Sequence, residues 1–247
     1  MIAALVLATV IAQPSYYSPG EAEALFQQGA TAFDQGDYDG AIAAWQKLAD
    51  HGFASQDVLY NLGTAALKKG DLGHAVLWLE RARRAGGPRD DVTANLEAAR
   101  ARQGDKVVGQ VGDPFIERIA AASSPDLVAM AFLAAWLGGW ALAFVFRFLK
   151  PGRRTWAAVL SALLLVASLP LGLLLGAHVW VEKNTHDAVV LSPTVQAREL
   201  PAPNAKVSFE VHAGLKVRLL ETEGAFVRIR LPNGLVGWAE KEGLAEL

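Results

Sequence analysis

The chain of 247 residues contains no cysteine. This absence excludes thiol catalysis, disulfide bonds, cysteine-ligated metal ions and iron–sulfur clusters, so each folded domain must be stable through packing alone. Charge is also scarce, because charged residues make up only 19% of the chain and the formal net charge is −2. Neither the N-terminal segment before the long apolar stretches nor the C-terminal segment after them carries the basic excess that is typical of nucleic-acid binders.

Catalytic patterns are absent as well. The sequence has no phosphate-binding glycine loop, no nucleophile elbow and no pair of carboxylates within an apolar stretch. The five histidines lack metal-ligand spacing and are scattered at His51, His74, His178, His186 and His212. Of these, His178 is the only one inside an apolar stretch, and its nearness to Trp180 and Glu182 favours a position at a membrane interface. The sequence therefore predicts a non-enzymatic protein without a cofactor or metal site.

What the chain does contain is a repeat with a period of 34 residues near its start. The residues Gly29, Gly36, Asp37, Ala41 and Trp45 recur at this spacing as Gly63, Gly70, Asp71, Ala75 and Leu79. That period is typical of tetratricopeptide repeats. The mid-helix glycines predict close packing of a second helix, and each Gly-Asp pair predicts the end of one helix and the cap of the next. We expect two all-α repeats, at about 22–55 and 56–89, within a domain 21–104 that ends in one further helix.

The first helix of each repeat is expected to line a concave partner-binding groove. This groove would contain Phe26, Phe33, Tyr60, Asn61, Thr64 and Asn95. Asn61 and Asn95 share one repeat position, and their amides could bond an extended peptide backbone or brace the neighbouring helix. Two repeats are few, so the outer face of the terminal helix needs a cover. The amphipathic juxtamembrane segment 113–122 could supply it, or could lie on the membrane surface.

Two long apolar stretches follow. Leu127 to Phe146 has no charged residue, and Trp156 to Val181 has only His178. Twenty residues of helix span about 30 Å, the thickness of a bilayer's hydrocarbon core. We therefore predict transmembrane helices at 126–147 and 156–181. The small residues Gly138, Gly139, Gly172 and Gly176 suggest close packing between the two spans, or dimerisation.

The short loop 148–155 between the spans is basic, with Lys150, Arg153 and Arg154 close to Arg147 and no acidic residue. Positively charged loops stay in the cytoplasm. Residues 1–12 form an apolar run that resembles a signal peptide or a short uncleaved anchor. The expected localisation is thus the bacterial inner (cytoplasmic) membrane, with two spans and with both flanking domains on the periplasmic side.

After Val181 the pattern alternates between apolar and charged residues, which predicts short strands. We expect them at Ala188–Leu191, Val207–Val211, Leu215–Leu219, Phe226–Leu231 and Leu235–Ala239. A small all-β barrel over 187–247 is the natural closure. The segment resembles bacterial Src-homology-3-type domains, whose last hairpin commonly ends in Gly-Trp, here Gly237-Trp238. Family members can bind peptidoglycan through exposed aromatics, but we expect Phe209, Phe226 and Trp238 in the core.

The chain resembles the BatE members of the Bat aerotolerance family. The resemblance rests on the order of these parts and on the helix Asn95–Arg100 after the repeats. The resemblance implies a multidomain membrane protein: tetratricopeptide hairpins, a two-helix transmembrane hairpin and a Src-homology-3-like barrel. It also implies protein partners, namely membrane proteins with von Willebrand factor A domains and indirectly a MoxR-type ATPase. The expected function is a scaffold or adaptor in an envelope stress or aerotolerance complex, in contact with lipid but not nucleic acid. The alternative is recognition of cell-wall peptidoglycan or peptide by the barrel.

Overall fold

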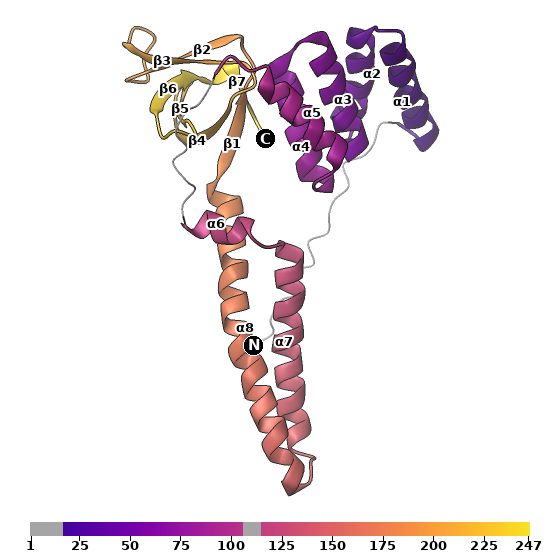
Figure 1. Ribbon diagram of the computed structural model, residues 1–247, viewed down its shortest axis with the longest axis vertical. Coiled ribbons are helices and arrows are strands. Elements are labelled where there is room, and N and C mark those ends of the chain that lie inside the picture. The colour runs from indigo at the N-terminus through magenta and orange to yellow at the C-terminus, as the bar shows by residue number, and fades with distance from the viewer. Residues whose placement is uncertain (1–16, 106–114) are drawn as a thin grey trace. The chain divides into compact units, whose positions relative to one another are not determined.

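The computed structural model describes residues 17–105 and 115–247, which form two compact units (Figure 1). The first unit combines the repeat segment with Asp187–Leu247, and the second is formed by the described residues from 115 to 186. The predicted signal segment 1–12 lies outside the described residues. The first unit is therefore assembled from two parts of the chain that are separated in sequence by the whole second unit.

Five helices begin the first unit and pack as successive hairpins (Figure 1). They are α1 (Pro19–Asp34), α2 (Tyr38–Asp50), α3 (Gln56–Lys69), α4 (Leu72–Gly86) and α5 (Asp90–Ala101). Helix α2 packs against α1 and α3, and α5 packs against both helices of the second hairpin. This is the predicted arrangement of two helical hairpins followed by one terminal helix.

Local chemistry fixes where these helices begin and end. Gly36 and Gly70 follow the first helix of each hairpin and both have a positive φ, 78° and 89°, which glycine tolerates without a Cβ clash. Asp37 then accepts a hydrogen bond from the Gly40 N–H at 2.9 Å, and Asp71 accepts one from the His74 N–H at 3.1 Å. The predicted stop and cap signals are thus confirmed in both repeats.

The repeated small residues let the paired helices approach closely. A Cβ on Gly29 would lie 2.6 Å from Cε2 of Trp45, and one on Gly63 would lie 2.6 Å from Cγ of Leu79. Trp45 and Leu79 are 2% and 0% exposed, so the large side chain of the second helix fills the space that each glycine leaves. The predicted steric role of the repeated glycines is confirmed.

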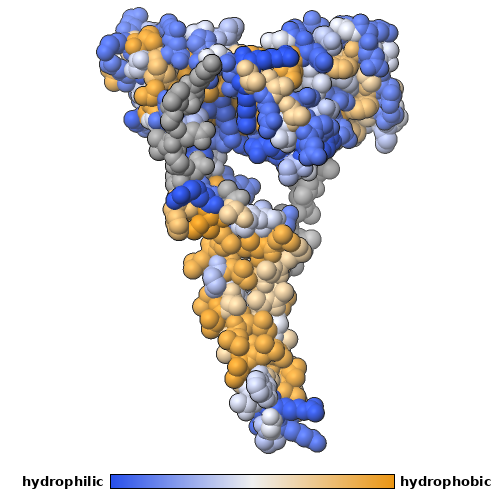
Figure 2. All heavy atoms as spheres, viewed as in Figure 1, coloured by the Kyte–Doolittle hydropathy of each residue, from blue (hydrophilic) through white to orange (hydrophobic). Residues whose placement is uncertain are grey.

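The second unit consists of α6 (Phe115–Ala121), α7 (Pro125–Phe146) and α8 (Pro151–Asn184). Helices α7 and α8 have 22 and 34 residues, and both are long and apolar enough to cross a membrane. Most of their apolar side chains are exposed, which distinguishes them from core helices of soluble proteins. Figure 2 shows apolar residues along both helices and hydrophilic residues where α7 passes into α8.

Some bounds in this unit differ from the sequence estimates. Helix α8 begins at Pro151, so Arg153 and Arg154 lie in its first turn and not in a loop. Proline suits the first helical turn because its missing N–H would have no partner there. Helix α6 belongs to the unit of α7 and α8 and packs against α8.

The C-terminal part of the first unit is one seven-stranded sheet with the order β3-β2-β6-β5-β4-β1-β7. The pairs β1–β7, β2–β3, β2–β6, β4–β5 and β5–β6 are antiparallel. The strands are β1 (His186–Val190), β2 (Thr194–Arg198), β3 (Val207–His212), β4 (Lys216–Glu223), β5 (Phe226–Arg230), β6 (Val236–Glu240) and β7 (Leu244–Glu246).

This sheet corrects the predicted barrel. The five predicted strands correspond to β1, β3, β4, β5 and β6, while β2 and β7 are additional. The sheet is open, with β3 and β7 as its two edge strands. Strand β3 pairs only with β2, and β7 pairs only with β1. The all-β prediction is confirmed, but closure into a Src-homology-3-like barrel is not seen. A separate apolar core forms within the sheet around Val190, Val211 and Ile229.

Candidate partner-binding site

The C-terminal sheet packs onto the second repeat and α5. Val189 of β1 is fully buried in one apolar cluster with Leu79 of α4 and Leu96 of α5. Gly73 near the start of α4 lies close to the sheet, because a Cβ there would lie 2.8 Å from the backbone Cα of Leu191. The sequence required a cover for the end of this short array, and the chain's own sheet supplies part of it.

Polar contacts accompany this apolar packing. Arg81 donates to the carbonyl oxygen of Glu246 at 2.6 Å, and Arg84 donates to that of Leu247 at 2.9 Å. Just after α5, the Gln103 side chain donates to the carbonyl oxygen of Gly214. The second repeat and the sheet are therefore joined by hydrogen bonds as well as by buried surface.

Glu80 is the main buried charge of the unit. Its side chain is 0% exposed and pairs with Arg83 at 2.7 Å and with Arg100 at 2.6 Å. Burial raises the pKa of Glu80. The hydrogen bond from Arg83 and the positive charges of Lys216, Arg83 and Arg100 outweigh that effect, so the pKa of Glu80 lies below its usual value. Glu80 thus ties α4 to α5 as an ion pair.

Asp187 gathers cations at the start of the sheet. Its carboxylate lies 2.9 Å from Lys216, 3.2 Å from Arg218 and 3.4 Å from Arg84. Burial raises the pKa of Asp187, while the hydrogen bond and charge of Lys216 and the charge of Arg218 outweigh that effect and lower it. Neither acid was predicted from the sequence as part of a site. The available signal for Glu80 was its place as a single acid before Arg81, Arg83 and Arg84.

Phe26 and Phe33, the two groove residues predicted on α1, lie against Trp45. Their ring centroids are 6.3 Å and 6.0 Å from that of Trp45, whose indole N–H donates to the carbonyl oxygen of Phe26 at 3.1 Å. Both phenylalanines are half-buried and flank the core of the first hairpin. Each therefore has a packed side and a remaining exposed part.

The structure brings Tyr60, Thr64 and Asn95 together. The amide of Asn95 donates to Thr64 Oγ1 at 2.9 Å and to the Tyr60 hydroxyl at 3.3 Å. Asn95 therefore braces α5 against α3, which was one of the two roles that the sequence left open. Asn61 is half-buried on α3 beside Tyr60.

An ion-pair network borders these three residues. Arg89 lies 4.9 Å over the Tyr60 ring and pairs with Asp57 at 2.6 Å and with Asp91 at 2.7 Å. Tyr60 is thus held by an amide at its hydroxyl group and by a guanidinium over its ring. Together these contacts give α3 and α5 a half-exposed surface of hydroxyl, amide and charged groups.

The four glycines predicted to pack between the apolar helices have different surroundings. Ser161 of α8 donates to the carbonyl oxygen of Gly139 at 2.9 Å, and a Cβ on Gly139 would lie 2.7 Å from Cγ of Leu165. A Cβ on Gly138 would make an ordinary contact of 3.5 Å with Leu164, and one on Gly172 would lie 3.2 Å from Phe132. A Cβ on Gly176 would meet nothing within 4 Å. Close approach of α7 and α8 therefore centres on Gly139.

The histidines and the aromatic residues of the sheet have varied surroundings. In the described residues no group of three or more His, Cys, Asp or Glu side chains is placed to hold a metal ion. His178 lies near the end of α8, 3.1 Å from the Ser123 hydroxyl. In the sheet, Phe226 is buried, and Phe209 and Trp238 are half-buried.

A comparison with protein families identifies the helical part. The family model described as "Tetratricopeptide repeat" matches residues 2–57 and 26–90. The match confirms the repeats, which are typically non-enzymatic modules for protein–protein interaction. No curated protein matches the chain. The repeats suggest a scaffold for protein–protein interaction. They are followed in the sequence by two helices apolar enough to span a membrane and by an antiparallel all-β region.

Proposed function

We propose that the chain is a non-enzymatic inner-membrane scaffold that binds partner proteins through its repeats, as part of a Bat-type envelope stress or aerotolerance complex. The observation that carries this proposal is the pair of tetratricopeptide hairpins with the half-exposed groups on α1, α3 and α5. The partners would be membrane proteins with von Willebrand factor A domains, and indirectly a MoxR-type ATPase.

The chemistry of the groove suits an extended segment of a partner protein. Phe26 and Phe33 present apolar surface at one end, while Thr64 and Asn95 present hydroxyl and amide groups at the other. An extended peptide backbone needs both donors and acceptors, and amide and hydroxyl side chains provide both. The bracing bond between Asn95 and Thr64 holds these groups in place, which lowers the entropy cost of binding.

Two features support one membrane orientation for this scaffold. If α7 and α8 both cross the bilayer, the repeats and the sheet emerge on one side, and their packing into a single unit requires that arrangement. The cations Arg147, Lys150, Arg153 and Arg154 gather where α7 passes into α8. Because such cations stay in the cytoplasm, the repeats and the sheet would face the periplasm.

Photo-crosslinking in intact cells tests the proposal. A photoreactive residue in place of Thr64 should crosslink a membrane protein with a von Willebrand factor A domain, and Phe26→Ala should weaken that crosslink. The matched control places the same photoreactive residue at Glu97, which is exposed on α5 away from the groove residues. If the Thr64 position captured nothing beyond the Glu97 control, the groove would not be the binding surface.

A further inference from the structure

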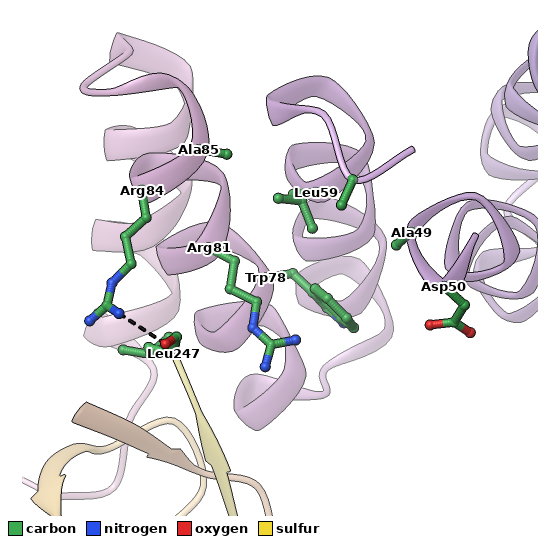
Figure 3. Close-up of a pocket in the computed structure, with 9 residues that line it drawn as sticks. Ala49, Asp50, Leu59, Trp78, Arg81, Arg84, Ala85 and Leu247 are labelled. Atoms are coloured by element: carbon green, nitrogen blue, oxygen red, sulfur yellow. Dashed lines mark hydrogen bonds between the residues drawn. The ribbon is translucent and has the colours of Figure 1, made fainter. Parts of the chain in front are cut away.

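A pocket of about 440 Å³ is lined by residues of both repeats and by Leu247, which follows the last strand (Figure 3). It is lined by Ala49, Asp50, Ala54, Leu59, Trp78, Arg81, Arg84, Ala85 and Leu247. Its size falls in the range of about 300–1,000 Å³ that is typical of ligand pockets. None of these residues belongs to the predicted groove, so the pocket is a separate feature of the repeat domain.

One part of the pocket is apolar. Trp78 of α4 and Leu59 of α3 are 8% and 5% exposed, and both line the pocket. Ala85 and Ala49 add small side chains around them, as Figure 3 shows. This lining is suited to one apolar side chain of moderate size.

Arg81 adds a cation to this apolar lining. Its guanidinium lies 5.0 Å over the Trp78 ring and donates to the carbonyl oxygen of Glu246. Within residues 17–105 and 115–247, no carboxylate forms an ion pair with Arg81. Burial, and to a lesser extent the charge of Arg84, lowers the pKa of Arg81. Arg81 is thus a half-buried cation that, within the described residues, pairs with no Asp or Glu side chain and donates to a backbone oxygen.

Arg84 is the second cation, and its acidic partner is shared. The Arg84 guanidinium is 3.4 Å from Asp187, whereas Lys216 and Arg218 are 2.9 Å and 3.2 Å from the same carboxylate. The Asp187 carboxylate therefore serves three cations, and Arg84 also donates to the backbone oxygen of Leu247 at 2.9 Å. Asp50, which also lines the pocket, accepts a hydrogen bond from Gln46 at 2.7 Å and would repel an anion from its own side. The charge distribution favours one anion, held on the Arg81 and Arg84 side.

We propose that this pocket binds a short segment of a partner protein in which an acidic residue adjoins an apolar one. The carboxylate accepts hydrogen bonds from Arg81 and Arg84, and the apolar side chain packs against Leu59 and Trp78. A guanidinium fits a carboxylate with two parallel hydrogen bonds, which gives the site directional selectivity for an acid over an amide. This binding site goes beyond the proposed function, since it shares no residue with the groove.

The probes are fluorescent pentapeptides in which Leu, Phe or Trp adjoins Glu, added to the full chain in lipid nanodiscs. Each has a control in which Gln replaces Glu. Fluorescence anisotropy should show binding of at least one Glu peptide that is about tenfold or more tighter than binding of its Gln control. Raising the salt concentration should weaken binding of the Glu peptide but not of its Gln control, because salt screens the ionic contact.

Two variants locate the binding. Ala85→Glu places a negative charge at the exposed rim of the pocket, while Ala94→Glu adds the same charge to the exposed surface of α5. Ala85→Glu should lower the affinity for the Glu peptide by about tenfold or more, and Ala94→Glu should leave that affinity unchanged. Tyr60→Phe should also leave it unchanged, since Tyr60 is a groove residue.

The proposal fails if no Glu peptide binds, if each Glu peptide binds no better than its Gln control, or if Ala85→Glu and Ala94→Glu have equal effects. Each of these results concerns the pocket alone. Crosslinking from Thr64 remains a separate readout of the groove, so failure of one site is distinguishable from failure of the other.

Discussion

The carboxylate of Asp105 holds His212 at two points, 2.6 Å from its backbone nitrogen and 2.7 Å from its ring Nδ1. Asp105 follows the last repeat helix, and His212 ends β3, so the whole second unit lies between them in sequence. This contact adds to the apolar packing of Val189. The repeats and the sheet therefore form one structure, and a partner protein would meet both together.

Gly63 tests the packing within a repeat. Alanine normally stabilises a helix by about 1 kcal/mol relative to glycine. At Gly63, however, the new methyl group would lie 2.6 Å from Leu79 Cγ and 3.0 Å from the Leu79 backbone nitrogen, so Gly63→Ala should destabilise by about 1–3 kcal/mol. Thermal unfolding measures the effect. The control Gly20→Ala meets nothing within 4 Å and should be neutral or stabilising.

Gly73 tests the contact between α4 and the sheet. A methyl group there would lie 2.8 Å from two backbone atoms of Leu191, which cannot move away by changing rotamer. Gly73→Ala should therefore loosen β1 and β7, although it improves helix propensity. Hydrogen exchange of their amides should speed up while that of β5 changes little. Unchanged exchange in β1 would contradict the packing of the sheet on α4.

The pair of His74 and Asp71 predicts a pH dependence. The hydrogen bond with Asp71, 2.8 Å long, raises the pKa of His74 above 6.5, against the opposing effect of burial. The stabilisation is therefore fully present below about pH 6.5 and is lost as the pH rises through the higher folded pKa. Because the pair is half exposed, it is worth at most about 1 kcal/mol. The wild-type chain should melt at a higher temperature than the His74→Gln variant at about pH 6, and this difference should shrink towards about pH 9. A difference that stays constant with pH would contradict this assignment.

Membrane orientation can be tested because the chain has no cysteine. Ala94, Ala225 and Gly152 are exposed positions that can each receive a single cysteine. An impermeant maleimide added outside the inner membrane should label the Ala94→Cys and Ala225→Cys variants, and should label Gly152→Cys only after permeabilisation. The reverse pattern would place the repeats in the cytoplasm. Different labelling of Ala94→Cys and Ala225→Cys would contradict the single unit.

The repeats were predictable because their signals are local. Gly70 and Asp71 encode the end of one helix and the start of the next within two residues. Gly63 and Leu79 are 16 positions apart in one hairpin, and the same pair of positions recurs as Gly29 and Trp45. A repeated local pattern gives two independent observations of one packing rule.

The additional strands were harder to predict. Strand β2 includes Gln196 and Arg198, and β7 has only three residues, so neither gives a long alternating pattern. Alternation marks which face of a strand is buried, but it does not say which strand lies beside it. The open order of the sheet therefore came only from the structure.

The sequence by itself determined the two hairpins, the two long apolar helices and most strands, because each depends on spacing within a few dozen residues. The 34-residue repeat indicated a short array whose end needed a cover. Only the tertiary structure showed that Val189 and Leu191, which follow the apolar helices in the sequence, provide that cover. It also showed that Glu80 and Asp187 hold the cations around the contact. Such contacts join surfaces that meet only after each part has folded, so they leave no periodic pattern in the chain.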